Sequence, residues 1–76
     1  MNYPFNNLKK VRKEIGVSIE TVADHIQVDP KTIYRYETSQ QAPNLYVATR
    51  LAAYYHKTLE ELFCINEYIS SLSTQG

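Results

Sequence analysis

The segment from residue 30 to residue 38 contains the side chains best suited to bind another molecule. Lys31 and Arg35 are four residues apart, so both cations lie on one face if this segment is helical. Either side chain can donate hydrogen bonds to the O6 and N7 acceptors of a guanine. Tyr34 lies between them in the sequence and can offer its ring to a thymine methyl group or its hydroxyl to a phosphate. These side chains indicate binding rather than catalysis.

The other reactive residue types do not form a site. His25 and His56 have no companion at metal-ligand spacing, and Cys64 is the only cysteine. No nucleophile is paired with a base, and there is no glycine-rich phosphate loop. We therefore expect neither an enzyme nor a bound metal or other cofactor. With one cysteine, no signal peptide and no apolar run of the ~18 residues that a membrane span needs, a cytoplasmic protein without membrane contact is expected.

The charges are balanced in total but not along the chain. Eight Lys and Arg residues offset eight Asp and Glu residues. Residues 1–57 hold all eight basic residues and five acidic ones, a net charge of +3, and residues 58–76 hold three acidic residues only, a net charge of −3. A nucleic-acid-binding domain often has a pI above ~9, so the zero total argues mildly against such a role. The basic part nevertheless contains residues 30–38.

Helices must position these side chains, because the chain has two glycines and no sustained strand-like alternation. Its 76 residues are enough for a single domain. Cap candidates precede four of the expected helices: Ser18, Asp29 (followed by Pro30), Asn44 and Thr58. Gly16 suits a left-handed end of the first helix. The expected helices cover about residues 5–15, 18–26, 30–38, 45–55, 59–63 and 64–72.

The apolar residues of these segments recur at three- and four-residue spacing, as in helices that share one core. We expect an all-α, compact five-helix domain with an additional short C-terminal helix, one domain over residues 1–76 with its core in residues 5–63. The inward faces are expected to consist of Phe5, Leu8, Val11, Arg12 and Ile15; Val22, Ala23 and Ile26; Ile33 and Tyr36; Leu45, Ala48, Leu51, Ala52 and Tyr55; and Leu59, Leu62 and Phe63.

A series of short motifs runs from residue 8 to residue 63. They are Leu-Lys-Lys-Val-Arg at 8–12, Gly-Val-Ser at 16–18, Val-Ala at 22–23, Val28, Thr-Ile-Tyr-Arg-Tyr-Glu at 32–37, Pro-Asn at 43–44, Leu-Ala at 51–52 and Thr-Leu-Glu-Glu-Leu-Phe at 58–63. In this order and at this spacing they resemble the phage-repressor (Cro/CI-like, XRE-type) helix-turn-helix regulators. The resemblance implies a lambda-repressor-like fold that places its third helix in the major groove of DNA.

The resemblance also implies roles for single residues. Arg12 and Glu37 match an arginine of the first helix and a glutamate at the end of the third, which form a largely structural ion pair. Ile19 stands where the family commonly has a glutamine that supports a phosphate contact, so only the amides of the helix N-terminus can hold that phosphate. Gln27 replaces the usual glycine of the turn, where a left-handed backbone costs about 1 kcal/mol.

We therefore expect two kinds of contact with double-stranded DNA. For the base-contacting residues the alternative is an ordinary solvated surface, and for the loop residues it is a role in shaping the loop only. The expected base contacts come from Lys31, Tyr34 and Arg35, and the expected backbone contacts come from Ser18, Ile19, Thr32, Gln40, Gln41 and Asn44.

A narrow apolar stripe follows the five-helix region. Ile65, Tyr68, Ile69 and Leu72 recur at i, i+3, i+4 and i+7. The stripe either packs back on its own domain or meets its copy in a second chain. We favour a dimer contact, because three further tyrosines at positions 46, 54 and 55 already supply much apolar surface.

The leading hypothesis is a sequence-specific DNA-binding transcriptional regulator, a repressor that binds an inverted-repeat operator as a homodimer. Such a short chain leaves no room for a separate effector domain, so control is expected to come from concentration, from proteolysis or from a regulatory protein partner. The alternative is a protein-interaction module of the same fold that acts as an antagonist or co-factor of another regulator. The zero net charge, Ile19 and the tyrosine-rich surface favour that alternative.

Overall fold

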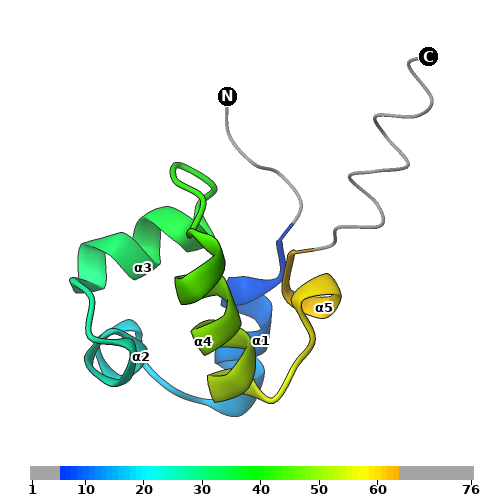
Figure 1. Cartoon of the computed structure of the whole chain (residues 1–76). Helices are drawn as coiled ribbons and strands as arrows, with labels where there is room; N and C mark the ends of the chain where they lie inside the picture. Colours follow the sequence, from blue (N-terminus) through cyan, green and yellow to red (C-terminus); the bar gives the residue numbers. More distant parts are fainter. Residues whose placement is uncertain (1–5, 64–76) are drawn as a thin grey trace.

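Five helices make up the protein in the computed structural model, which describes residues 6–63 (Figure 1). No strand occurs within this range, so the expected all-α architecture is confirmed. Phe5 and the helix expected over 64–72 lie outside the described residues. The helices are α1 (Leu8–Ile15), α2 (Ile19–Ile26), α3 (Pro30–Glu37), α4 (Leu45–Tyr55) and α5 (Leu59–Phe63).

Side chains just before the helices accept hydrogen bonds from the first free backbone amides. Ser18, Asp29 and Asn44 do so at 3.1, 2.8 and 2.9 Å, which confirms these three predicted caps. At α5 the cap is reciprocal. The Glu61 amide donates to the Thr58 hydroxyl at 3.1 Å, and the Thr58 amide donates to the Glu61 carboxylate at 2.9 Å. Thr58 therefore belongs to a full capping box, beyond the single cap that we predicted.

Three helices end in a left-handed residue. Gly16 has a φ of 86° after α1, Gln27 has 66° after α2, and His56 has 56° after α4. Glycine adopts this conformation freely, whereas Gln27 and His56 do so with a Cβ atom in a crowded position. The turn at Gln27 therefore has the left-handed backbone that glycine usually adopts at this position.

The core lies where α4 packs against α1, α2 and α5, and where α2 and α3 cross (Figure 1). Ile26 and Ile33 are almost fully buried at the crossing, and the partly buried Val28 packs beside them from the turn. The arrangement fixes the orientation of α3 by its inner face. The buried apolar residues are Leu8, Val11, Val22, Ala23, Ile26, Ile33, Tyr36, Ala48, Leu51, Ala52, Tyr55, Leu62 and Phe63.

Two residues expected in the core lie at the surface instead. Ile15 is 47% exposed in the last turn of α1, and Leu45 is 72% exposed in the first turn of α4. Both continue the apolar period of their helices past the point where another described element packs against them. The first helix is also shorter than expected and begins at Leu8, whose amide donates to the side-chain oxygen Oδ1 of Asn6 at 3.2 Å.

Candidate nucleic-acid interface

The outer face of α3 presents the three residues that we predicted to contact bases. Lys31, Tyr34 and Arg35 are all exposed, and 53% of Tyr34 is accessible to solvent. Ile33 and Tyr36 are buried on the opposite face of the same helix. A helix fixed through its inner face holds its outer side chains toward a partner, and an α-helix fits the major groove of DNA.

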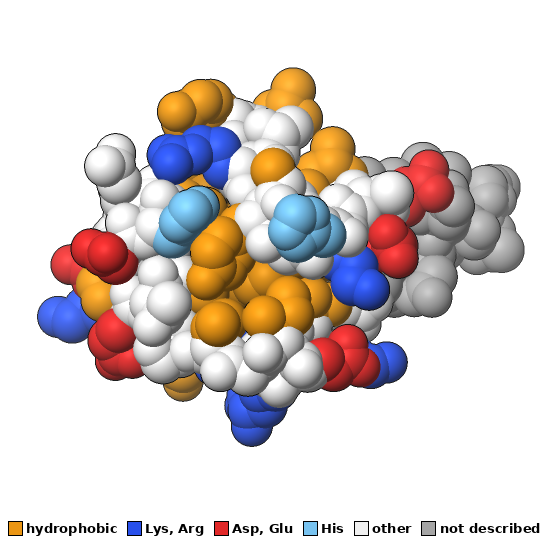
Figure 2. Space-filling view, turned by 90° about the horizontal axis from the view of Figure 1, so that it is seen from below, with side chains coloured by type: hydrophobic (Ala, Val, Ile, Leu, Met, Phe, Trp, Pro, Cys, Tyr) orange, Lys and Arg blue, Asp and Glu red, His pale blue; other side chains and the backbone are white. Residues whose placement is uncertain are grey.

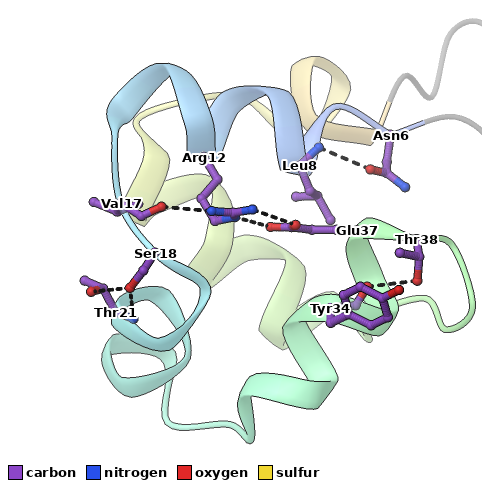
Figure 3. Close-up of polar contacts among 9 residues, drawn as sticks. All are labelled: Asn6, Leu8, Arg12, Val17, Ser18, Thr21, Tyr34, Glu37 and Thr38. Carbon is purple, nitrogen blue, oxygen red and sulfur yellow. Dashed lines mark hydrogen bonds and ion pairs between the residues drawn. The ribbon is translucent and has the colours of Figure 1, made fainter.

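The loop after α3 is bound to the end of that helix by hydrogen bonds. The Thr38 hydroxyl donates to the Tyr34 carbonyl at 2.9 Å (Figure 3). The amides of Gln40 and Gln41 both donate to the Arg35 carbonyl, at 2.9 and 3.3 Å. The Gln40 side chain also donates to the Thr38 hydroxyl at 2.8 Å. Gln40 and Gln41 thus lie at the C-terminal end of α3, beside the predicted base contacts.

Asn6 connects the start of the described chain to the same loop. Its side-chain amide donates to the Ser39 hydroxyl at 2.9 Å and to the Tyr36 carbonyl at 3.3 Å. Its side-chain oxygen Oδ1 accepts a hydrogen bond from the amide of Leu8, the first residue of α1 (Figure 3). Asn6 was not among the residues predicted to form the site, because its partners lie thirty or more residues away in the sequence.

Arg12 and Glu37 form a two-point ion pair between α1 and α3 (Figure 3). Arg12 Nε lies 2.6 Å from Glu37 Oε2, and Nη2 lies 3.2 Å from Oε1. Arg12 Nη1 also donates to the Val17 carbonyl at 3.0 Å. The two side chains are 11% and 2% exposed, so the pair is shielded from solvent. The pair thus joins the end of α3 to α1.

The electrostatic environment of this ion pair favours the charged form of Arg12. The hydrogen bond to Glu37 raises the pKa of Arg12 above its already high value. Tyr55 lies near both groups; its burial, with the charge of Glu37 adding to the effect, raises the pKa of its hydroxyl strongly. Tyr55 therefore stays neutral. Among the described residues, no buried side-chain nitrogen or oxygen lacks a hydrogen-bond partner.

The N-terminus of α2 holds the next group of predicted contacts. Ser18 accepts the Thr21 amide, and its hydroxyl lies 2.9 Å from the Thr21 hydroxyl (Figure 3). Ile19 is half-buried and packs against the core, so its side chain contributes to folding. A phosphate at this end of α2 would therefore meet backbone amides and the Ser18 hydroxyl.

The remaining predicted backbone contacts are Thr32, near the start of α3, and Asn44, at the end of the loop after α3. Thr32 is half-buried in the first turn of α3. Asn44 is exposed, and its side-chain oxygen Oδ1 accepts the Val47 amide, which leaves its side-chain nitrogen as the group suited to a phosphate.

The far end of α2 depends on an arginine that our sequence analysis did not consider. Arg50 of α4 donates to the carbonyls of Ile26 at 2.9 Å and His25 at 3.2 Å, the last carbonyls of α2. Its guanidinium carbon lies 5.7 Å from the centre of the Tyr46 ring, within cation–π range. Arg50 therefore acts as a C-cap supplied from another helix, which sequence spacing cannot reveal.

A second face of the molecule differs from the outer face of α3 in how its apolar and charged side chains are distributed. Figure 2 shows apolar side chains in the middle of this face, between the two histidines, with acidic and basic side chains alternating around its margin. Such mixed charge gives no uniformly basic patch for a phosphate backbone.

Within residues 6–63, no three His, Cys, Asp or Glu side chains gather as metal ligands, and no helix there is long and apolar enough to cross a membrane.

Comparison with known proteins agrees with this geometry. The helix-turn-helix family model matches residues 8–62, which include all five helices except the last residue of α5. An HTH-type transcriptional regulatory protein of Methanococcus vannielii is 29% identical over 66 residues, which cover 87% of this chain and 20% of that protein. Similarly named proteins of two Methanococcus maripaludis strains, C5 and C7, are 29% identical over 68 residues, 90% of this chain and 21% of theirs.

This chain thus spans about a fifth of the length of those relatives. The family match over residues 8–62 includes the α2–turn–α3 unit, the caps of Ser18 and Asp29 and the Arg12–Glu37 pair. From the family match and this geometry, the chain belongs to the XRE-type helix-turn-helix family of DNA-binding transcriptional regulators.

Proposed function

We propose that this protein binds double-stranded DNA sequence-specifically and acts as a transcriptional repressor in the cytoplasm. In this proposal α3 enters the major groove, where Lys31 and Arg35 donate to guanine edges and Tyr34 meets a thymine methyl or a phosphate. The observation that carries the proposal is the exposure of these three side chains on the outer face of a helix whose inner face is buried. Family membership supports the same assignment.

The sugar-phosphate backbone would be held on both sides of α3. The amides and hydroxyl at the start of α2, around Ser18 and Ile19, are suited to one phosphate, with Thr32 nearby on α3. Gln40, Gln41 and Asn44 are suited to another, because the loop that carries them is bound to the end of α3. These contacts would set the register of α3 without reading sequence.

A homodimer completes the proposal. Two copies related by a two-fold axis would place their α3 helices in successive major grooves about 34 Å apart on an inverted repeat. One copy alone offers few base contacts, whereas two copies double the recognised sequence. The dimer contact proposed for Ile65, Tyr68, Ile69 and Leu72 falls outside the described residues.

Selection of binding sites from random duplex DNA, followed by salt titration of the best site, tests the proposal. We expect a two-fold-symmetric site whose affinity falls steeply with salt. Arg35→Ala should weaken binding by about 1–3 kcal/mol and relax one position of each half-site. Lys13→Ala is the matched control, because it removes one positive charge from an exposed position of α1.

A selection that recovers no sequence motif, with only weak salt-sensitive binding, would contradict sequence-specific recognition. Retention of the biological function by the folded double variant Lys31→Ala and Arg35→Ala would also contradict it. Both results favour the second candidate, a module that binds another regulator. That candidate is supported by the exposure of Leu45 and Tyr46, at 72% and 68%.

A further inference from the structure

One face of α4 carries a tyrosine, an arginine and a second tyrosine at four-residue spacing. These are Tyr46, Arg50 and Tyr54, which the helix places in one row. Arg50 donates to the Ile26 carbonyl at 2.9 Å and to the His25 carbonyl at 3.2 Å. The centre of the Tyr54 ring lies 4.5 Å from the centre of the His25 ring. Both contacts attach the last turn of α2 to α4.

The side chain of Arg50 is well placed to keep this attachment. It is half-buried, and its guanidinium carbon lies 5.7 Å from the centre of the Tyr46 ring. A planar guanidinium that is already held over a ring loses little freedom when it forms hydrogen bonds. The end of a helix also attracts a cation, because its last carbonyl oxygens are unpaired and carry a partial negative charge.

The turn that follows α2 is bonded to both of the helices that it joins. The amides of Gln27 and Val28 donate to the Ala23 carbonyl in α2, at 2.7 and 3.0 Å. The Asp29 carbonyl accepts the Thr32 amide of α3 at 2.8 Å. We call α2, the turn and α3 together the recognition unit. A shift at the end of α2 is therefore passed on to α3.

Polar side chains hold the recognition unit at two separate places. At the end of α3, Arg12 pairs with Glu37, and Asn6 donates to the Tyr36 carbonyl. At the end of α2, Arg50 binds the last two carbonyls of that helix. A body held at one place can pivot about it, whereas a second attachment restricts the pivot. The bonds of Arg50 thus help to fix the orientation of the unit on α4.

We infer that Arg50 is a positioning residue for DNA recognition: by holding the end of α2 on α4, it sets the angle at which α3 presents Lys31 and Arg35 to the bases. The inference rests on the proposed function and adds a residue that acts on base recognition through α2. Hydrogen bonds to base edges weaken steeply with misalignment, so a small rotation of the recognition unit disturbs them. Charge attraction to phosphates has a longer range and tolerates the same rotation.

Binding of Arg50→Met to two DNA duplexes tests this role. One duplex carries the site selected by the parent protein, and the other has the same composition in scrambled order. The measurement is made where circular dichroism shows the variant to be fully folded. Affinity for the selected site should fall about tenfold, as for other residues that act on a ligand without touching it. Affinity for the scrambled duplex and the slope of affinity against salt should match the parent.

Two further variants complete the comparison. Arg50→Lys keeps the charge but replaces the planar guanidinium by a single ammonium group, so its affinity for the selected site should lie between those of the parent and Arg50→Met. If Arg50→Met does not fold, Arg50→Lys replaces it, and an affinity equal to that of the parent would then overturn the inference. Lys13→Met is the matched control, because it removes a cation from an exposed position of α1, and both affinities should stay the same.

Two other results would overturn the inference. In the first, Arg50→Met unfolds at a lower urea concentration but, when folded, binds the selected site as tightly as the parent. Arg50 would then stabilise the fold and nothing more. In the second, both duplexes lose affinity equally and the salt slope falls by about 1, which is the signature of a direct contact between Arg50 and a phosphate.

Residual dipolar couplings of the free protein give a measurement without DNA. They report how the amides of α2 and α3 are oriented relative to those of α1. Arg50→Met should change the couplings of the recognition unit, whereas Lys13→Met should not. Unchanged couplings in Arg50→Met would overturn the inference. A parent that selects no DNA motif would instead overturn the proposed function, and the couplings would still show whether Arg50 holds α3 in its orientation.

Discussion

The side-chain amide of Asn6 donates a hydrogen bond of 2.9 Å to the hydroxyl of Ser39, thirty-three residues further along the chain. Ser39 has a φ of 63°, so the bond holds a serine in the left-handed region. The same amide reaches the Tyr36 carbonyl near the end of α3. The residue before α1 thus fixes the loop that follows the proposed recognition helix.

Replacement of Asn6 should therefore loosen that loop. Asn6→Ala removes the hydrogen bond to the Leu8 amide and both bonds to the loop, and we expect a loss of about 1–2 kcal/mol in the free energy of unfolding. Urea unfolding measures the loss, and faster amide exchange at Gln40 and Gln41 would locate it. Asn6→Asp keeps the acceptor for the Leu8 amide but loses the donor for the loop, so it separates the contribution of the bond to α1 from that of the bonds to the loop.

Removal of one partner of the Arg12–Glu37 pair should be the most damaging of these changes. Arg12→Ala leaves a carboxylate that is 2% exposed without its cation, and we expect a loss of about 3–5 kcal/mol. Urea unfolding again gives the value. Lys13→Ala, at an exposed position of the same helix, should change stability by less than about 0.5 kcal/mol. Equal stability of the two variants would show that the pair contributes nothing.

A glycine at position 27 should stabilise the domain. Gln27 has a φ of 66°, and Gln27→Gly relieves a cost of about 1 kcal/mol, reduced by the extra freedom of glycine in the unfolded chain. Thermal unfolding should show a higher Tm. As a control, Asp24→Gly introduces a glycine in the interior of α2, where it should lower the stability by about 1 kcal/mol. A fall in Tm for Gln27→Gly would contradict the prediction.

The capping box of α5 should make stability depend on pH. Hydrogen bonds from Thr58 lower the pKa of Glu61, so the folded chain binds this proton more weakly than the unfolded chain. The contribution of Glu61 is present above its unfolded pKa and is lost as the pH falls through the folded pKa. The stability difference between the parent and Glu61→Gln should therefore shrink from about pH 6 to pH 3. Glu14→Gln, at an exposed position of α1, controls for charge loss alone.

Much of the fold could be predicted from local sequence. The caps at Ser18, Asp29 and Asn44 are short-range signals, since each side chain bonds an amide two or three residues away. The exposure of Leu45 and Ile15 could not be predicted by periodicity, which continues along a helix whether or not another element covers it. Burial depends on tertiary packing at each end of the helix.

The connections around the candidate site were harder to predict because they are distant in sequence. Arg50 bonds carbonyls twenty-four and twenty-five residues earlier, and Asn6 bonds groups thirty and thirty-three residues later. No spacing rule within one helix relates such positions. The Arg12–Glu37 pair was expected only through the resemblance to the phage-repressor family. The exposed positions of Lys31, Tyr34 and Arg35 followed from helical periodicity alone.

The shortness of the helices has a consequence for DNA recognition itself. The three helices α1, α2 and α3 have eight residues each. Isolated helices below about 12 residues are marginal in water, so α3 owes its shape to the packing around it. The DNA-contacting face of α3 therefore exists only while the domain is folded. Binding to a cognate DNA site would in turn stabilise the folded state. Cooperative unfolding would then release the operator in the same step that melts the domain.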